Sequence, residues 1–150
     1  MSDKIKFQDL TRLHQSISPE LENVFKSVLD SSAFIQGPCV AQFEKDFGAF
    51  TGAPFTLGLS NGTDALELAL EALDLKPGDV VAVPSLTFTA TAEAVVRLGG
   101  VPIFVDCDAD TQISEKSHFE KAIATYGKNI RGMIAVHLHG RSCQIEALAE

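Results

Sequence analysis

The second half of the chain alternates between short apolar runs and segments with helical periodicity, and this rhythm restricts the fold more than any other feature. Apolar runs occupy residues 80–83, 101–105 and 130–138, and helix-like segments lie between them at 92–98 and 119–126. The runs are apolar throughout, as in strands of a parallel sheet that is covered on both faces. Short connections between strands and helices then predict an α/β domain with three layers and a mainly parallel sheet.

The first half is predicted to be mostly helical. Ser18 and Pro19 are the residue types of a helix start, and a second helix is expected after the turn at 36–38. A short apolar strand is expected at 55–59, followed by a helix that Asn61 caps and that begins at Gly62. We therefore expect N-terminal helices over about residues 1–52 and the start of the α/β domain over about residues 53–150.

Composition narrows the class of protein. The 12 basic and 20 acidic residues give a net charge of −8, which disfavours a phosphate backbone as a partner, so nucleic acid is not expected. No apolar run reaches the roughly 20 residues of a membrane span, and the polar N-terminus is not a signal peptide, so no membrane is expected. Cys39, Cys107 and Cys143 are far apart and odd in number, which favours reduced thiols in a cytoplasmic protein.

Residues 59–66 carry the strongest chemical signal. A strand enters a polar turn and a helix begins at Gly62, so the first helical amides, with the Thr63 hydroxyl, have the arrangement that binds a phosphate. A capped helix start without a ligand explains these residues equally well. The same stretch matches the G-x-S-x-G pattern of α/β-hydrolases, with Ser60 as nucleophile, but no partner acid or histidine can be assigned.

Phe88 lies among small hydroxyl residues directly after the predicted strand at 80–83. Open α/β sheets bind ligands at the carboxyl ends of their strands, and an aromatic ring there can lie flat against a planar ligand ring. The alternative is a phenylalanine packed into the core at a helix start, which the residues taken alone favour.

No metal site is predicted. Asp106, Asp108 and Asp110 have the spacing of the first half of an EF-hand loop, but the required glycine and glutamate are replaced by threonine at position 111 and serine at position 117. His137 and His139 fall on one face of the predicted strand, as two metal ligands do, but no third ligand can be identified.

Several short motifs occur in the order and spacing of one known family. They are Phe34-Ile35-Gln36-Gly37-Pro38, Ser60-Asn61-Gly62-Thr63-Asp64-Ala65-Leu66, Lys76-Pro77-Gly78-Asp79, Thr87-Phe88-Thr89-Ala90-Thr91, Gly99-Gly100-Val101-Pro102 and Val136-His137-Leu138-His139-Gly140. From about residue 5 to 149 the chain resembles the nucleotide-sugar aminotransferases of the DegT type, a branch of the fold-type-I enzymes that use pyridoxal 5′-phosphate (PLP). The resemblance favours a phosphate turn over a hydrolase nucleophile at Ser60.

The resemblance implies the first part of a large PLP-binding domain. It assigns Gly62 and Thr63 to the phosphate of PLP and Phe88 to the face of the pyridine ring. The aspartate and the Schiff-base lysine of the family fall beyond residue 150, so we assign no catalytic residue. Residues 144–150 also have the pattern of a helix opening without a stop signal, and we expect the chain to be an inactive N-terminal fragment.

For the parent protein, the resemblance implies transfer of an amino group from an amino acid to a keto sugar linked to a nucleotide. Glutamate is the expected donor, and a homodimer with active sites at the subunit interface is the expected assembly. Two alternatives within the same group stay open, namely another fold-type-I PLP enzyme and a sugar dehydratase in which histidine replaces the lysine.

Overall fold

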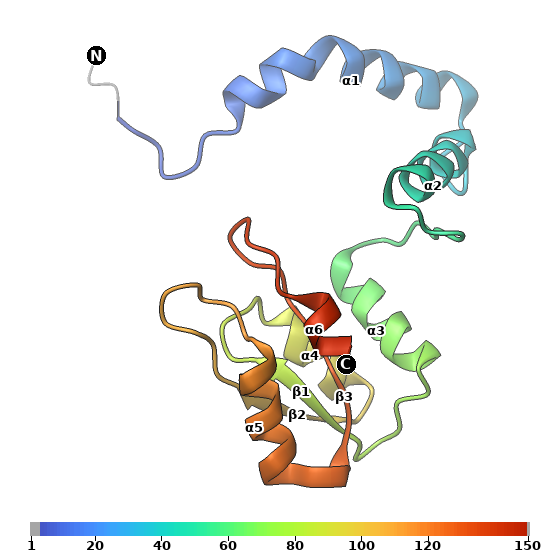
Figure 1. The fold of residues 1–150 in the computed structure, drawn as a ribbon. Helices are drawn as coiled ribbons and strands as arrows, with labels where there is room; N and C mark the ends of the chain where they lie inside the picture. Colours follow the sequence, from blue (N-terminus) through green and yellow to red (C-terminus); the bar gives the residue numbers. More distant parts are fainter. Residues whose placement is uncertain (1–3, 150) are drawn as a thin grey trace. The chain divides into compact units, whose positions relative to one another are not determined.

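The chain divides into two compact units, Met1–Gly58 and Leu59–Glu150 (Figure 1). The structure is a computed structural model and describes residues 4–149, except for the side chain of Lys128. The two units are described separately below. The expected assignment of residues 53–150 to a cofactor-binding domain stays a prediction.

The first unit contains two helices, α1 (Thr11–Ser31) and α2 (Pro38–Thr51). The prediction that the first helix begins at Ser18 is wrong, because Pro19 lies inside α1. The helix starts earlier because the Asp9 carboxylate accepts the N–H of Thr11 at 2.9 Å, which satisfies one of the unpaired donors at the helix start. Figure 1 shows α1 as a bent helix, as expected when a proline removes an internal hydrogen bond.

The predicted strand at 55–59 is wrong as well, since these residues form no ladder with any described strand. Phe55 and Leu57 are 92% and 74% exposed. The N–H of Gly58 donates to Oε1 of Glu44 at 2.7 Å, so a side chain on α2 takes the place of a neighbouring strand. An apolar run becomes a strand only where a ladder partner is present.

The second unit is built on a three-stranded parallel sheet in the order β2-β1-β3. The strands are β1 (Val80–Pro84), β2 (Val101–Val105) and β3 (Ile130–Met133). The helices are α3 (Gly62–Ala72), α4 (Ala90–Arg97), α5 (Lys116–Tyr126) and α6 (Ile145–Ala149), with a 3-10 turn at Gly127–Asn129.

Alternate side chains of β1 enter two separate cores. Val81 and Val83 pack on one face with Leu70 of α3 and Val95 of α4. Ala82 packs on the other face in a cluster that includes Phe119 of α5. Helices therefore cover both faces of the sheet, which confirms the predicted three-layer α/β fold.

The third strand is shorter than the predicted run 130–138 because its ladder with β1 ends at a proline. Ile134 N–H donates to the Ala82 carbonyl at 2.9 Å, after which a parallel ladder requires an N–H from residue 84. Pro84 has none to give. The chain leaves the sheet here, so His137 and His139 do not lie on a strand as predicted.

Across the part of the chain that the structure describes, no helix combines the length and the apolar character needed to cross a bilayer.

Candidate functional site

The helix α3 begins in a turn whose side chains are bonded to one another. Asn61 has an extended backbone, and its Oδ1 accepts the N–H of Asp64 at 2.9 Å, which confirms the predicted cap. In return, Nδ2 of Asn61 donates to Oδ2 of Asp64 at 3.0 Å, and the Ser60 hydroxyl donates to the same oxygen. These hydrogen bonds hold the turn without any contribution from a ligand.

The first residue of α3, Gly62, has open space at its Cβ position, and Thr63 is half-buried. A Cβ atom placed on Gly62 would meet no atom within 4 Å. Among the described residues, the backbone N–H groups of Gly62 and Thr63 have no hydrogen-bond partner. Unpaired amides at the positive end of an eleven-residue helix, with room in front of them, form an arrangement that can hold an anion.

Phe88 lies in the connection between β1 and α4, and the residue is 75% exposed. The connection is held by a hydrogen bond of 3.0 Å between the hydroxyls of Thr87 and Thr91 and by the Phe88 carbonyl, which accepts the N–H of Thr91 at 3.1 Å. The ring is thus presented on a fixed backbone and is not part of a core. This exposure removes the alternative of a core phenylalanine within the described residues.

The Gly62 turn and the Phe88 connection lie at the same edge of the sheet. Helix α3 leads through residues 73–79 into the amino end of β1, so the helix begins on the side of the sheet toward which that strand runs (Figure 1). Phe88 follows the carboxyl end of β1 directly. In open α/β sheets this is the edge that binds ligands.

Sequence reasoning missed Asp64 as part of this site. Its carboxylate accepts hydrogen bonds from Ser60 and Asn61, as described above. The spacing of a capping residue followed three positions later by an acid is a known signature of a helix start, and it could have identified Asp64.

Ser60 does not have the contacts of a hydrolase nucleophile. Its hydroxyl donates to Asp64, and Asn61 Nδ2 lies 3.3 Å from its oxygen. No histidine among the described residues forms a hydrogen bond with Ser60, whereas a serine nucleophile requires a base.

The residues considered for metal binding are bonded to their own loops. The Asp108 carboxylate accepts the N–H groups of Asp110 at 3.0 Å and Thr111 at 2.7 Å. These bonds, those of Thr111 first, lower the pKa of Asp108 below its usual 3.8. Nδ1 of His137 accepts the N–H of Cys143 at 3.0 Å. In the described part of the chain, no three histidine, cysteine or acidic side chains are grouped as a metal site requires.

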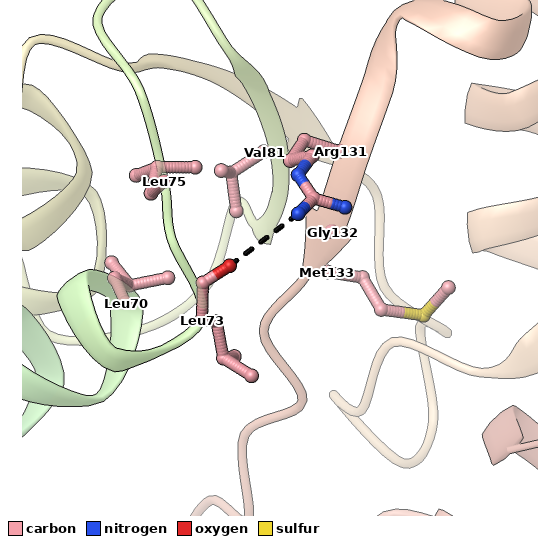
Figure 2. A pocket seen from close by; sticks show the side chains of 7 residues that line it. All are labelled: Leu70, Leu73, Leu75, Val81, Arg131, Gly132 and Met133. Carbon is pink, nitrogen blue, oxygen red and sulfur yellow. Dashed lines mark hydrogen bonds between the residues drawn. The ribbon is translucent and has the colours of Figure 1, made fainter.

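A pocket of about 200 Å³ has a lining that includes neither Gly62, Thr63 nor Phe88. Figure 2 shows the residues that line it. Leu70 and Leu73 line it from the carboxyl end of α3, which is the opposite end from Gly62. Its one charged lining group is Arg131, whose Nη2 is 3.5 Å from the carbonyl oxygen of Leu73. A lining of mainly apolar residues with one cation offers no set of acid, base or nucleophile.

Comparison with known proteins identifies the family of the chain. The model of the DegT/DnrJ/EryC1/StrS aminotransferase family matches residues 15–150. The chain is 35% identical over 144 residues to a dTDP-3-amino-3,6-dideoxy-alpha-D-galactopyranose transaminase of Aneurinibacillus thermoaerophilus, covering 96% of this chain and 39% of that protein. It is 35% identical over 148 residues to a 3-oxo-glucose-6-phosphate:glutamate aminotransferase of Bacillus subtilis, covering 98% of this chain and 33% of that protein.

A solved structure shares the fold. The crystal structure of NtdA from Bacillus subtilis with bound cofactor PMP matches with a TM-score of 0.90 and 32% identity, over 99% of this chain and 34% of that one. The chain therefore spans between a third and two fifths of these relatives. From the family match and the shared fold we conclude that the chain belongs to the DegT/DnrJ/EryC1/StrS aminotransferase family.

Proposed function

We propose that this chain forms the phosphate-binding and ring-binding part of a PLP-dependent sugar aminotransferase. The parent protein would transfer an amino group from glutamate to the keto group of a sugar linked to a nucleotide. Two relatives support the substrate classes by their names, one a transaminase of a dTDP-linked amino sugar and the other a glutamate aminotransferase acting on a keto sugar phosphate.

The observation that carries the proposal is the open space in front of Gly62. A Cβ atom at this position would meet no atom within 4 Å, and among the described residues the N–H groups of Gly62 and Thr63 have no hydrogen-bond partner. A phosphate ester fits there, because it is an anion with several acceptor oxygens and requires close approach to the backbone. The related NtdA structure holds PMP, a cofactor with such a phosphate, and this supports the same group for the parent of this chain.

The residues of this chain would bind and orient the cofactor. Gly62 and Thr63 would donate their backbone N–H groups to the phosphate, and the Thr63 hydroxyl is a further donor. The exposed ring of Phe88 would lie against the pyridine ring and exclude water from that face. When bound, PLP supplies the electron sink that amino-group transfer requires. We assign no proton transfer to any residue of this chain.

Binding of pyridoxamine 5′-phosphate tests the proposal directly. This ligand has no aldehyde and cannot form imines with surface lysines, so any binding measured by calorimetry reflects the site. Pyridoxamine, which lacks the phosphate, and inorganic phosphate are the reference ligands. We expect pyridoxamine 5′-phosphate to bind more tightly than either. Equal affinity for pyridoxamine and its phosphate ester would contradict a phosphate site.

The activity of the chain itself is a separate part of the proposal. We propose that the 150-residue chain does not convert a keto-sugar nucleotide with glutamate, because no catalytic lysine is assigned in it. Formation of amino sugar by the purified chain, followed by mass spectrometry, would contradict this. The parent is further proposed to be a cytoplasmic homodimer, which light scattering of the full-length protein and fractionation of cells test.

A further inference from the structure

We infer that Asp64 is a positioning residue of the phosphate turn, and that it acts through Ser60 and Asn61. Its carboxylate would hold these two side chains so that the N–H groups of Gly62 and Thr63 stay directed at the open space. The inference rests on the proposed function and adds a residue to which no ligand contact is assigned.

Asp64 is the point at which the bonds of the turn meet. Oδ2 accepts from the Ser60 hydroxyl and from Nδ2 of Asn61 at 3.0 Å, while the backbone N–H of the same residue donates to Oδ1 of Asn61 at 2.9 Å. The backbone hydrogen bond of Asp64 and its side-chain hydrogen bonds have separate effects. The backbone bond caps the helix and needs no side chain at position 64, whereas the two bonds to Oδ2 tie the residues that precede Gly62.

A carboxylate beside a phosphate site has two opposite effects. Its charge repels the phosphate, which weakens binding. Its hydrogen bonds order the turn, which strengthens binding because less conformational freedom is lost with the ligand. Asp64 is half-buried, and two donors share one of its oxygens, so the carboxylate is held within the turn. We therefore expect the ordering effect to be the larger one.

Replacement of Asp64 separates positioning from folding. Asp64→Ala removes both bonds to Oδ2 but keeps the backbone N–H that Asn61 caps. We expect the dissociation constant for pyridoxamine 5′-phosphate to rise about tenfold, with the thermal midpoint nearly unchanged. Asp64→Asn keeps an acceptor oxygen without the charge, and its loss should be limited to about threefold. Glu71→Ala removes an acid from the other end of α3 and should leave affinity unchanged.

Two measurements on the same variants decide the matter. Calorimetry with pyridoxamine 5′-phosphate and with pyridoxamine reports binding. Amide hydrogen exchange at positions 64 and 65, whose N–H groups donate to Oδ1 and to the carbonyl oxygen of Asn61, reports the order of the turn without ligand. Asp64→Ala should speed exchange at these two amides, while amides of β1 keep wild-type protection. A double variant with Asn61→Ala should lose less affinity than the two single changes predict together.

Several outcomes would overturn the inference. Tighter binding by both Asp64 variants would mean that repulsion is the larger effect. Unchanged affinity in Asp64→Ala, or unchanged exchange at positions 64 and 65, would remove the positioning role. Faster exchange throughout β1 with a lower midpoint would make Asp64 a general stability residue. The proposed function would be contradicted by a different result, namely a wild-type chain that does not prefer pyridoxamine 5′-phosphate over pyridoxamine. In that case the exchange data would still test the effect of Asp64 on the turn.

Discussion

Nη1 of Arg97 on α4 lies 2.7 Å from Oε1 of Glu67 on α3, and this ion pair links the two helices that follow the candidate binding loops. A second pair, 2.5 Å long, joins Nη2 of Arg97 to Glu93 on the same helix. Hydrogen bonds from Arg97, first to Glu93 and then to Glu67, raise the pKa of the guanidinium. One arginine therefore connects the helix that begins at Gly62 with the helix that follows Phe88.

The link between α3 and α4 should contribute modestly to stability. Arg97 is half-exposed, so we expect Arg97→Met to lower the thermal midpoint by roughly 1–3 °C at low salt, because exposed pairs are weak. The difference should shrink at 1 M salt, where such pairs are screened. Lys26→Met is the matched control, since its pair with Asp30 lies within one helix. An Arg97 variant with the wild-type midpoint at low salt would contradict the prediction.

Substitution at Gly62 should block the phosphate without unfolding the chain. A Cβ at this position meets no atom within 4 Å, so Gly62→Val places its side chain in the space proposed for the ligand. We expect loss of binding of both pyridoxamine 5′-phosphate and inorganic phosphate, measured by calorimetry, with a thermal midpoint close to wild type. Gly132→Val is the control, because its Cβ also meets no atom within 4 Å but lies on β3. Undiminished phosphate binding by Gly62→Val would place the anion elsewhere.

Removal of the Phe88 ring should affect only ligands that have a ring. We expect Phe88→Ala to weaken pyridoxamine 5′-phosphate roughly tenfold, since stacked aromatic contacts and buried ring area are lost together, and to leave inorganic phosphate unchanged. Phe104→Ala provides the comparison, because that ring is also exposed, at 65%, but belongs to β2. Equal losses of phosphate and of its pyridoxamine ester in Phe88→Ala would refute the stacking role.

Acid should loosen the loop that contains Asp108. The pKa of this carboxyl is lowered by the N–H and hydroxyl of Thr111 first and by further bonds and charges after it. A carboxyl whose pKa is lowered in the folded state stabilises that state when the pH is above the ordinary pKa of 3.8. This stabilisation is lost as the pH falls through the lowered pKa of the folded state. Asp108→Asn should therefore show a smaller loss of stability between about pH 4 and pH 2 than the wild type. Denaturant unfolding at several pH values measures the free energy of unfolding. An identical change of this free energy with pH in both proteins would exclude a contribution from Asp108.

Local sequence signals were sufficient where the interactions that define an element join residues close together in the sequence. Asn61 before Gly62 defines the start of α3, since the capping bond to Asp64 joins residues three positions apart. The apolar runs that became β1 and β2 were located by sequence alone, as were the helices between the strands. The family match agrees with the motifs that predicted it. The assignment of Gly62, Thr63 and Phe88 to a cofactor remains a prediction.

Only the tertiary structure decided which apolar or turn-like segments found partners. Residues 55–59 have the composition of a strand but no ladder neighbour among the described strands. Pro84 on β1 ends the ladder of β3 at Met133, although residues 134–136 that follow are also apolar. Pro19 looks like a helix start, yet the Asp9 carboxylate permits an earlier one. Composition and spacing determine which conformations a segment favours, but strand length and exposure depend on hydrogen-bond donors and surfaces that distant residues supply. That is why the sequence located the capped start of α3, while the open space at Gly62 and the exposure of Phe88 required the folded chain.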